Sequence, residues 1–201
     1  EQKLMINDVL KGKIPNIVLA SASPRRAELL RQIGLEFRVL PSQINEPDIQ
    51  NHPIEAVKHI AYQKAEVVAD QLESGLVIGA DTTVVANQAI IGKPASYQQA
   101  IDSLKKLSGC RHQVMTGVAL IDVSQKTEMV WSETTSVFFR QLHNEEIEAY
   151  VANGEANDKA GAYGIQGEAA TFVNRIEGCY FNVVGLPLAS LTENLYQIYW
   201  S

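Results

Sequence analysis

Residues 16–26 read NIVLASASPRR, and this stretch decides the fold class. The apolar run at 16–20 is typical of a short buried strand. Ser23-Pro24 then predicts a helix start, because serine suits the N-cap and proline suits the first helical position. The helix is expected to end near Gly34. A strand that leads directly into a helix indicates an α/β domain.

The rest of the chain continues this alternation. We predict further strands at 37–40, 76–80 and 172–176, a hairpin at 83–91 that turns at Asn87-Gln88, and a long antiparallel pair at 113–123 and 128–140. We predict further helices at 54–72, 96–107 and 143–153, a largely helical region at 180–196, and loops at 41–53 and 161–167. Long antiparallel strands beside parallel ones indicate a mixed sheet. We therefore expect one α/β domain with a cleft.

Composition narrows the classes of partner. The chain has 201 residues and a net charge of −6, which argues against a nucleic-acid partner because such binding depends on basic surface. It has no apolar run long enough to span a membrane, and its start has no signal-peptide pattern. Cys110 and Cys179 leave a single disulfide open, although reduced buried thiols are favoured. The four histidines are dispersed, which disfavours a structural zinc site. We expect a cytoplasmic protein.

The helix start at 23–26 is a candidate phosphate site. A helix N-terminus offers unpaired N–H groups and the positive end of the helix dipole. Ser21 and Ser23 add hydroxyl donors, and Arg25 and Arg26 add planar cationic donors that suit phosphate. The alternative is a capped helix with a basic first turn. Cations there oppose the dipole, so the pair favours a bound anion.

Asp81 is a candidate catalytic carboxylate. It follows the predicted strand at 76–80, and ligands of α/β sheets gather at the carboxyl ends of strands. An aspartate beside an apolar strand needs a metal, a donor or water. The alternative is that its side chain caps a turn. This segment alone does not separate the two interpretations.

Three more charged residues are weaker candidates. Lys64 lies on the apolar face of the predicted helix at 54–72, where it either extends to the surface or meets an anion. Lys93 lies in the tight segment Gly92-Lys93-Pro94, and Glu46 lies in the loop at 41–53. Each of the last two would equally suit an exposed loop.

The segment DKAGAYGIQG at 158–167 is more specific. Its three glycines would let the backbone approach a flat ligand. Gln166 offers both a donor and an acceptor, as recognition of a nucleobase edge requires. The alternative is a glycine-rich turn. The sequence contains no phosphate-binding P-loop, no dinucleotide-binding fingerprint and no serine-hydrolase elbow, which disfavours those three classes.

Taken together, these segments resemble the Maf family of nucleoside triphosphate pyrophosphatases. The matching stretches, from residue 16 to near the C-terminus, are LASASPRRAELL, Glu46, the helix with Lys64, VIGADT, GKP, SGCRHQVMTGVAL, DKAGAYGIQG and GCYFNVVGLPL. The resemblance implies an elongated fold related to the ITPase type, with a strongly curved mixed sheet, two lobes with a cleft between them, and often a homodimer. It implies a Maf-like domain at 16–201 after an N-terminal extension at 1–15.

The resemblance also implies an activity and a set of roles. The KAGAYGIQG form of the late loop is similar to that of the subgroup that hydrolyses dTTP and UTP to the monophosphate and pyrophosphate, a role in cleaning the nucleotide pool. By position, Asp81 would be the general base, and Mg²⁺ or Mn²⁺ would bind Glu46 and Asp81. The residues that would determine substrate choice are Arg25, Thr82 and Gln166. The other residues that would line the site are Ser23, Arg26, Glu46, Lys64 and Lys93.

Three other functions remain open from the sequence. The chain could have another base preference, such as 7-methyl-GTP, although that subgroup carries a different late segment. It could bind nucleotides as a regulator without turnover. It could also be a phosphatase of small phosphate esters, which would release orthophosphate instead of pyrophosphate.

Overall fold

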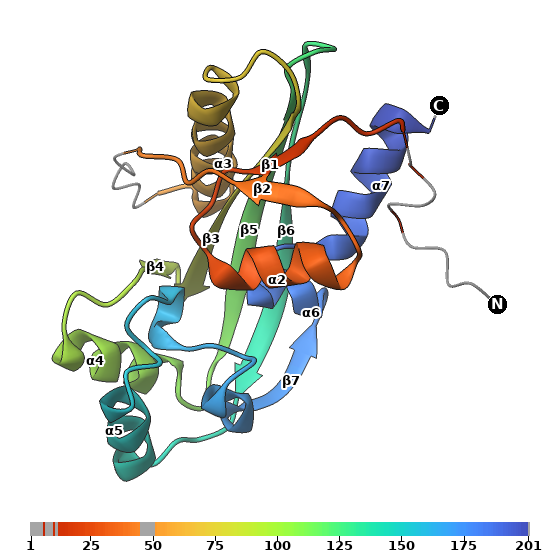
Figure 1. Ribbon diagram of the computed structural model, residues 1–201. Helices are drawn as coiled ribbons and strands as arrows, with labels where there is room; N and C mark the ends of the chain where they lie inside the picture. Colours follow the sequence, from red (N-terminus) through yellow and green to blue (C-terminus); the bar gives the residue numbers. More distant parts are fainter. Residues whose placement is uncertain (1–5, 7–9, 11, 45–50, 201) are drawn as a thin grey trace.

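The computed structural model describes residues 6, 10, 12–44 and 51–200 (Figure 1). Within these residues, seven strands form one mixed sheet in the order β2-β1-β3-β5-β6-β7, with β4 paired to β3. The strands are β1 (Ile17–Leu19), β2 (Phe37–Val39), β3 (Leu76–Ala86), β4 (Ala89–Ile91), β5 (Arg111–Asp122), β6 (Thr127–Phe139) and β7 (Val173–Glu177). The helices are α2 (Pro24–Gln32), α3 (Pro53–Ala69), α4 (Tyr97–Leu107), α5 (Asn144–Ala152), α6 (Tyr180–Val184) and α7 (Leu188–Tyr199), with 3₁₀ turns η1 (Ala160–Ala162) and η2 (Glu168–Phe172).

The sheet has parallel and antiparallel parts, as the sequence predicted. Strand β1 runs parallel to β2 and β3, and β3, β5, β6 and β7 are antiparallel in turn. The long strands β3, β5 and β6 connect two lobes of an elongated molecule (Figure 1). We call β1, β2, α3 and α7 the upper lobe, and α4, α5, η1, η2 and β7 the lower lobe. Helix α2 lies between them.

Several local predictions are confirmed. Helix α2 begins at Pro24 after the N-cap Ser23. The Ser96 side chain accepts a hydrogen bond from the Gln99 N–H, and so caps α4 as expected. The β3–β4 hairpin turns at Asn87 and Gln88, which both have positive φ. No helix in the described part of the chain is both long and apolar enough to cross a bilayer.

Strand β3 corrects the prediction of a strand that ends before Asp81. It is continuous from Leu76 to Ala86, so Asp81 lies in its middle. The cause is non-local: β5 pairs with β3 residue by residue from Leu76 to Val85 and satisfies the backbone beyond residue 80. The sequence signal was misleading because the polar run of residues 81–83 interrupts the apolar pattern.

The C-terminal region 180–196 is largely helical, as predicted. The structure divides it into two helices, α6 and α7. Gly185, with φ of +129°, ends α6, and Pro187 precedes α7, where its missing N–H costs nothing.

Cys110 and Cys179 are both free, as the sequence favoured. They are half-buried, whereas fully buried thiols were expected.

Helix α3 packs closely on the sheet because the residues at the contact have small side chains or none. Ala61 and Ala65 of α3 meet Val77 and Ala119 in a buried cluster. Gly79 of β3 also lies under the helix, where an added Cβ would lie 2.2 Å from the Ala61 carbonyl oxygen. This close contact sets the height of α3, and therefore of Lys64, above Asp81.

Candidate active site

The site lies at a gap in the sheet. On one edge of β3, β1 pairs with residues 76–78 and β4 pairs with residues 84–86. Within the described chain, residues 79–83 have no strand partner on that edge, whereas β5 pairs with them on the other. Successive side chains of a strand point to opposite faces, so the gap gives one cavity access to Asp81 on the α3 face and to Thr82 on the other.

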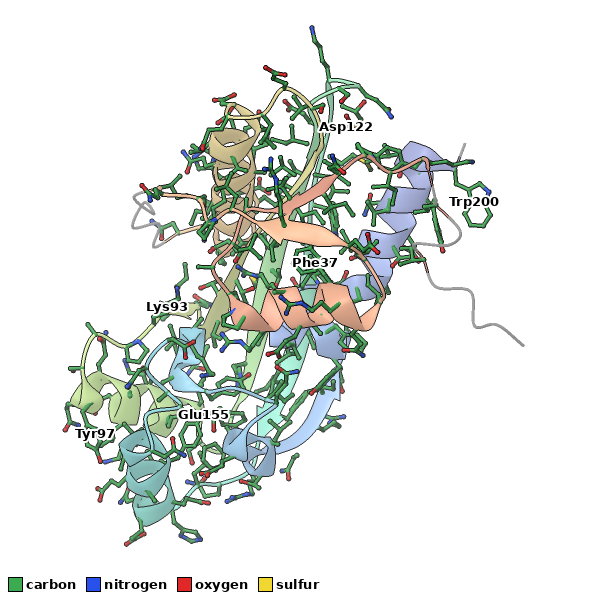
Figure 2. All side chains as sticks on the ribbon, in the orientation of Figure 1. Phe37, Lys93, Tyr97, Asp122, Glu155 and Trp200 are labelled. Atoms are coloured by element: carbon green, nitrogen blue, oxygen red, sulfur yellow. The ribbon has the colours of Figure 1, made fainter. Side chains whose placement is uncertain are left out.

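The segment 20–26 and the loop 158–167 enclose a cavity of about 370 Å³ at this gap. Its lining gathers every described residue that the sequence predicted for the site: Ser23, Arg25, Arg26, Lys64, Asp81, Thr82, Lys93 and Gln166. The remaining candidate, Glu46, lies outside the described residues. Lys93 lies where the two lobes meet (Figure 2). The cavity is thus the cleft expected between the lobes.

Lys64 and Asp81 form an ion pair at the base of the cavity. Lys64 Nζ lies 2.8 Å from Asp81 Oδ1, and the two side chains are 11% and 15% exposed. Lys64 therefore does not extend to the surface, as one interpretation allowed. Because water is largely excluded from this pair, the attraction between the two charges is stronger than in a surface ion pair, and each residue helps to fix the position of the other.

Arg26 is buried and serves as a connector. Its guanidinium donates to the Gly185 carbonyl oxygen at 2.9 Å and to the hydroxyls of Ser21 and Thr82 at 3.0 Å each. Thr82 in turn shares a 2.9 Å hydrogen bond with Thr116 on β5. These bonds join the start of α2 to β3, β5 and the end of α6. Arg26 therefore fixes one wall of the cavity.

Arg25 points toward the loop 158–167 of the lower lobe. Its guanidinium lies 3.4 Å from Asp158 Oδ2, and Asp158 also pairs with Lys159 at 2.7 Å. Burial alone would raise the pKa of Asp158, but the hydrogen bond and charge of Lys159 and the charge of Arg25 lower it. The Arg25–Asp158 pair therefore bridges α2 and the loop of the lower lobe. Sequence reasoning treated Asp158 and Lys159 only as part of a glycine-rich segment, because charged loop residues are usually solvated.

The start of α2 keeps the features of an anion site. Ser23 occupies the N-cap, but its side chain accepts no capping hydrogen bond from the helix. The first-turn N–H groups of a nine-residue helix therefore lack a side-chain cap at the cavity. Ser21 instead accepts a hydrogen bond from the Ser23 N–H at 3.3 Å.

Among the described residues that line the cavity, the acidic ones are Asp81 and Asp158. The described residues include no group of three or more His, Cys, Asp or Glu side chains placed to hold a metal. Asp81 pairs with Lys64, and Asp158 of the lower lobe pairs with Arg25. A hard divalent cation can bind through one or two carboxylates together with substrate phosphates and water. The described donors fit that mode and do not fit an all-protein cage.

A family model described as Maf-like protein matches residues 16–198. This chain belongs to the Maf family. The match confirms the family that the sequence motifs indicated. Nearly the whole of the described sheet, both sides of the cavity and the loop 158–167 fall within the matched Maf region.

Curated Maf-family relatives are similar over most of their length. A protein named dTTP/UTP pyrophosphatase from Ruminiclostridium cellulolyticum is 49% identical over 182 residues, which cover 90% of this chain and 94% of the relative. Proteins of the same name from Pelotomaculum thermopropionicum and Acetivibrio thermocellus are each 51% identical, over 89% of this chain and 94% and 93% of their own. A solved nucleoside-triphosphatase / dITP/XTP pyrophosphatase from Mycobacterium abscessus has 12% identity and a TM-score of 0.42 over 63% of this chain and 75% of that chain, a likeness too distant to carry an argument.

Proposed function

We propose that this chain hydrolyses dTTP and UTP to the monophosphate and pyrophosphate. The observation that carries the proposal is the cavity at the sheet gap, where cations and helix N–H groups surround the Lys64–Asp81 pair. Relatives that are about half identical bear the name dTTP/UTP pyrophosphatase. The reaction suits the site, because phosphoryl transfer depends mainly on positioning and charge neutralisation.

The triphosphate would lie against the basic wall. Arg25, Lys64 and Lys93 line the cavity from three different elements, so they can approach different phosphate oxygens. The N-terminus of α2 adds backbone N–H donors beside Ser23. Arg26 has its hydrogen bonds directed to Ser21, Thr82 and Gly185, so it supports this wall from behind.

Asp81 would act as the general base. An attacking water held by its carboxylate would form a bond to the α-phosphorus while the bond from that phosphorus to the oxygen bridging to the β-phosphate breaks. The water proton passes to Asp81, and pyrophosphate leaves with the bridging oxygen. Lys64, at 2.8 Å, orients the carboxylate and adds positive charge near the developing negative charge.

A divalent cation fits this arrangement. Asp81 and Glu46 would hold Mg²⁺ or Mn²⁺ together with phosphate oxygens, and the bound ion would neutralise phosphate charge. Glu46 enters this proposal from the family resemblance, because it lies outside the described residues.

Base recognition would fall to the lower lobe and to the β3 edge. Gln166 lines the cavity on the loop 158–167, and its amide can both donate to and accept from a pyrimidine edge. Thr82 lines the cavity too, and the hydrogen bonds of its hydroxyl with Arg26 and Thr116 fix its orientation. Arg25 completes the set of residues that we assign to substrate choice.

The decisive experiment incubates the protein with a panel of normal and modified nucleoside triphosphates, with Mg²⁺ or Mn²⁺. It scores pyrophosphate against orthophosphate. Release of one pyrophosphate per monophosphate from dTTP and UTP supports the proposal. Release of orthophosphate would indicate a phosphatase of phosphate esters, binding without product would indicate a regulator, and preference for 7-methyl-GTP would indicate the other subgroup.

We further propose that the protein works in the cytoplasm as a homodimer, with free nucleotides and not nucleic acid or membrane as its partners. The net charge of −6 supports the exclusion of polyanions. Sedimentation equilibrium tests the dimer, and a monomer at every concentration examined would reject it.

A further inference from the structure

Two hydrogen bonds, one buried and one partly buried, hold the loop 158–167 from behind. Tyr163 and Gly164 line the cavity beside Gln166, and both contact residues outside the loop. The Tyr163 hydroxyl lies 2.8 Å from His112 Nε2 on β5. The Gly164 N–H donates to the Tyr150 hydroxyl on α5 at 3.2 Å. The residues just before Gln166 are therefore tied to the sheet and to a helix at once.

His112 makes a rigid attachment point. It is 1% exposed, and its ring packs edge-on against Phe139 and Tyr163, with centroids 4.8 and 5.5 Å apart. Burial lowers the pKa of His112 to about 4, although the nearby Cys110 backbone opposes this shift. The imidazole is therefore neutral at neutral pH and pairs with a neutral hydroxyl. It carries no charge toward the phosphates.

Tyr150 connects both ends of the loop. It is 3% exposed, and besides its bond with Gly164 its hydroxyl donates to Glu155 Oε1 at 3.1 Å. The other oxygen of Glu155 accepts the Glu168 N–H at 3.2 Å. Glu155 precedes the loop and Glu168 follows it, so this chain of bonds closes the loop at its base.

We infer that His112 and Tyr150 are positioning residues for base recognition. Through Tyr163 and Gly164 they hold Gln166 in place. Gln166 then lies at the distance from Thr82 and the basic wall that a pyrimidine nucleotide requires. This inference rests on the proposed function and deepens it. The hydrogen bonds of His112 and Tyr150 to the loop end at Tyr163 and Gly164 and not at the basic wall, which consists of Arg25 on α2, Lys64 on α3 and Lys93 in the segment between β4 and α4. Loosening the loop at residues 163 and 164, away from the Asp158 that pairs with Arg25, should therefore impair recognition of the base and leave recognition of the phosphates unchanged.

The test uses Tyr163→Phe and Tyr150→Phe, each of which removes one hydroxyl and keeps the ring. Three probes separate base from phosphate: UTP, CTP, which differs from UTP at the base edge, and inorganic tripolyphosphate, which has no base and serves as a competitive inhibitor. We expect the ratio of kcat/KM for UTP over CTP to fall about tenfold, mainly through KM for UTP, because small misplacements of binding groups are costly. The inhibition constant of tripolyphosphate should stay within twofold of the wild-type value.

The matched control is Tyr97→Phe. The Tyr97 hydroxyl donates to the Glu148 carbonyl oxygen, so this variant loses a hydrogen bond at the outer edge of the same lobe (Figure 2). It should keep the wild-type ratio.

Two results would overturn the inference. One is an unchanged UTP over CTP ratio in both folded variants. The other is an equal loss for UTP, CTP and tripolyphosphate, which a purely structural role would produce. If Tyr163→Phe does not fold, Tyr150→Phe alone decides. Wild-type protein that releases no pyrophosphate from UTP would instead reject the proposed function, so the two failures are distinguishable.

Discussion

Gly117 lies directly opposite Asp81 in the β3–β5 ladder, under the first turns of α3. An added Cβ on Gly117 would lie 2.2 Å from the Val57 carbonyl oxygen. The absent side chain therefore lets α3 lie close to the strand that carries Asp81. The same helix carries Lys64, so the geometry of the ion pair depends on this glycine.

Gly117→Ala should lift α3 from the sheet. We expect the free energy of unfolding to fall by about 3 kcal/mol, as for other overpacked interiors, and turnover to fall as Lys64 moves from Asp81. Urea unfolding and pyrophosphate release measure the two effects. Gly92→Ala is the control for stability, because its new methyl group would meet no atom within 4 Å. Unchanged stability and activity in Gly117→Ala would contradict this account of the helix position.

Asp81→Asn should abolish turnover and leave the fold intact. The amide keeps the shape of the side chain but cannot accept the proton of water, and loss of a general base typically costs about 10²- to 10⁴-fold in rate. Pyrophosphate release measures the rate, and circular dichroism checks the fold. Asp102→Asn on the exposed face of α4 removes a carboxylate elsewhere and should keep full activity. Wild-type turnover by Asp81→Asn would show that the assigned base is wrong.

The two adjacent arginines should behave differently. Arg25→Ala should lower kcat/KM about a hundredfold, by analogy with loss of one transition-state donor worth about 3 kcal/mol, and leave stability nearly unchanged, because the Arg25–Asp158 pair is partly exposed. Arg26→Ala should also lower stability, by about 2 kcal/mol, because it removes the hydrogen bonds that Arg26 donates to the Gly185 carbonyl and to two hydroxyls. Thermal unfolding measures the loss of stability and pyrophosphate release measures the loss of activity, so the two measurements together distinguish the two variants. Equal melting temperatures for the two variants would refute the connector role of Arg26.

His112 should make stability depend on pH. Its pKa is lowered to about 4 in the folded protein, whereas the usual value is 6.5. The unfolded chain therefore takes up a proton first, so the stabilisation is fully present above pH 6.5 and is lost as the pH falls toward 4. Between pH 6.5 and 5 this loss amounts to about 2 kcal/mol. Urea unfolding at both pH values should show it in the wild type and not in His112→Gln.

Glu146→Gln is the control for this pH range. The hydrogen bond from Arg140 lowers the pKa of Glu146 from 4.5 to about 2, so the stability that Glu146 supplies is present above pH 4.5 and is lost below it. Glu146→Gln should therefore keep the wild-type slope between pH 6.5 and 5. Identical slopes for the wild type and His112→Gln would contradict the assignment to His112.

Much of the fold could be predicted because its signals are local. The Ser23-Pro24 start of α2, the Ser96 cap of α4 and the paired apolar segments of β5 and β6 depend on neighbouring residues and on hydrophobic period. The course of β3 through Asp81 could not be predicted in the same way. A polar residue inside a strand is tolerated there because a distant strand supplies the ladder and a distant lysine supplies the charge.

The sequence by itself determined which residues we assign to the site, since the motifs around Arg25, Asp81 and Gln166 carry both the chemistry and the family resemblance. Only the tertiary structure decided what each residue contacts. It paired Lys64 with Asp81, turned Arg26 inward and Arg25 toward Asp158, and tied Tyr163 to His112. The physical reason is that residue type and local period fix a side chain's chemistry and its face, whereas its partner depends on contacts between segments far apart in the chain.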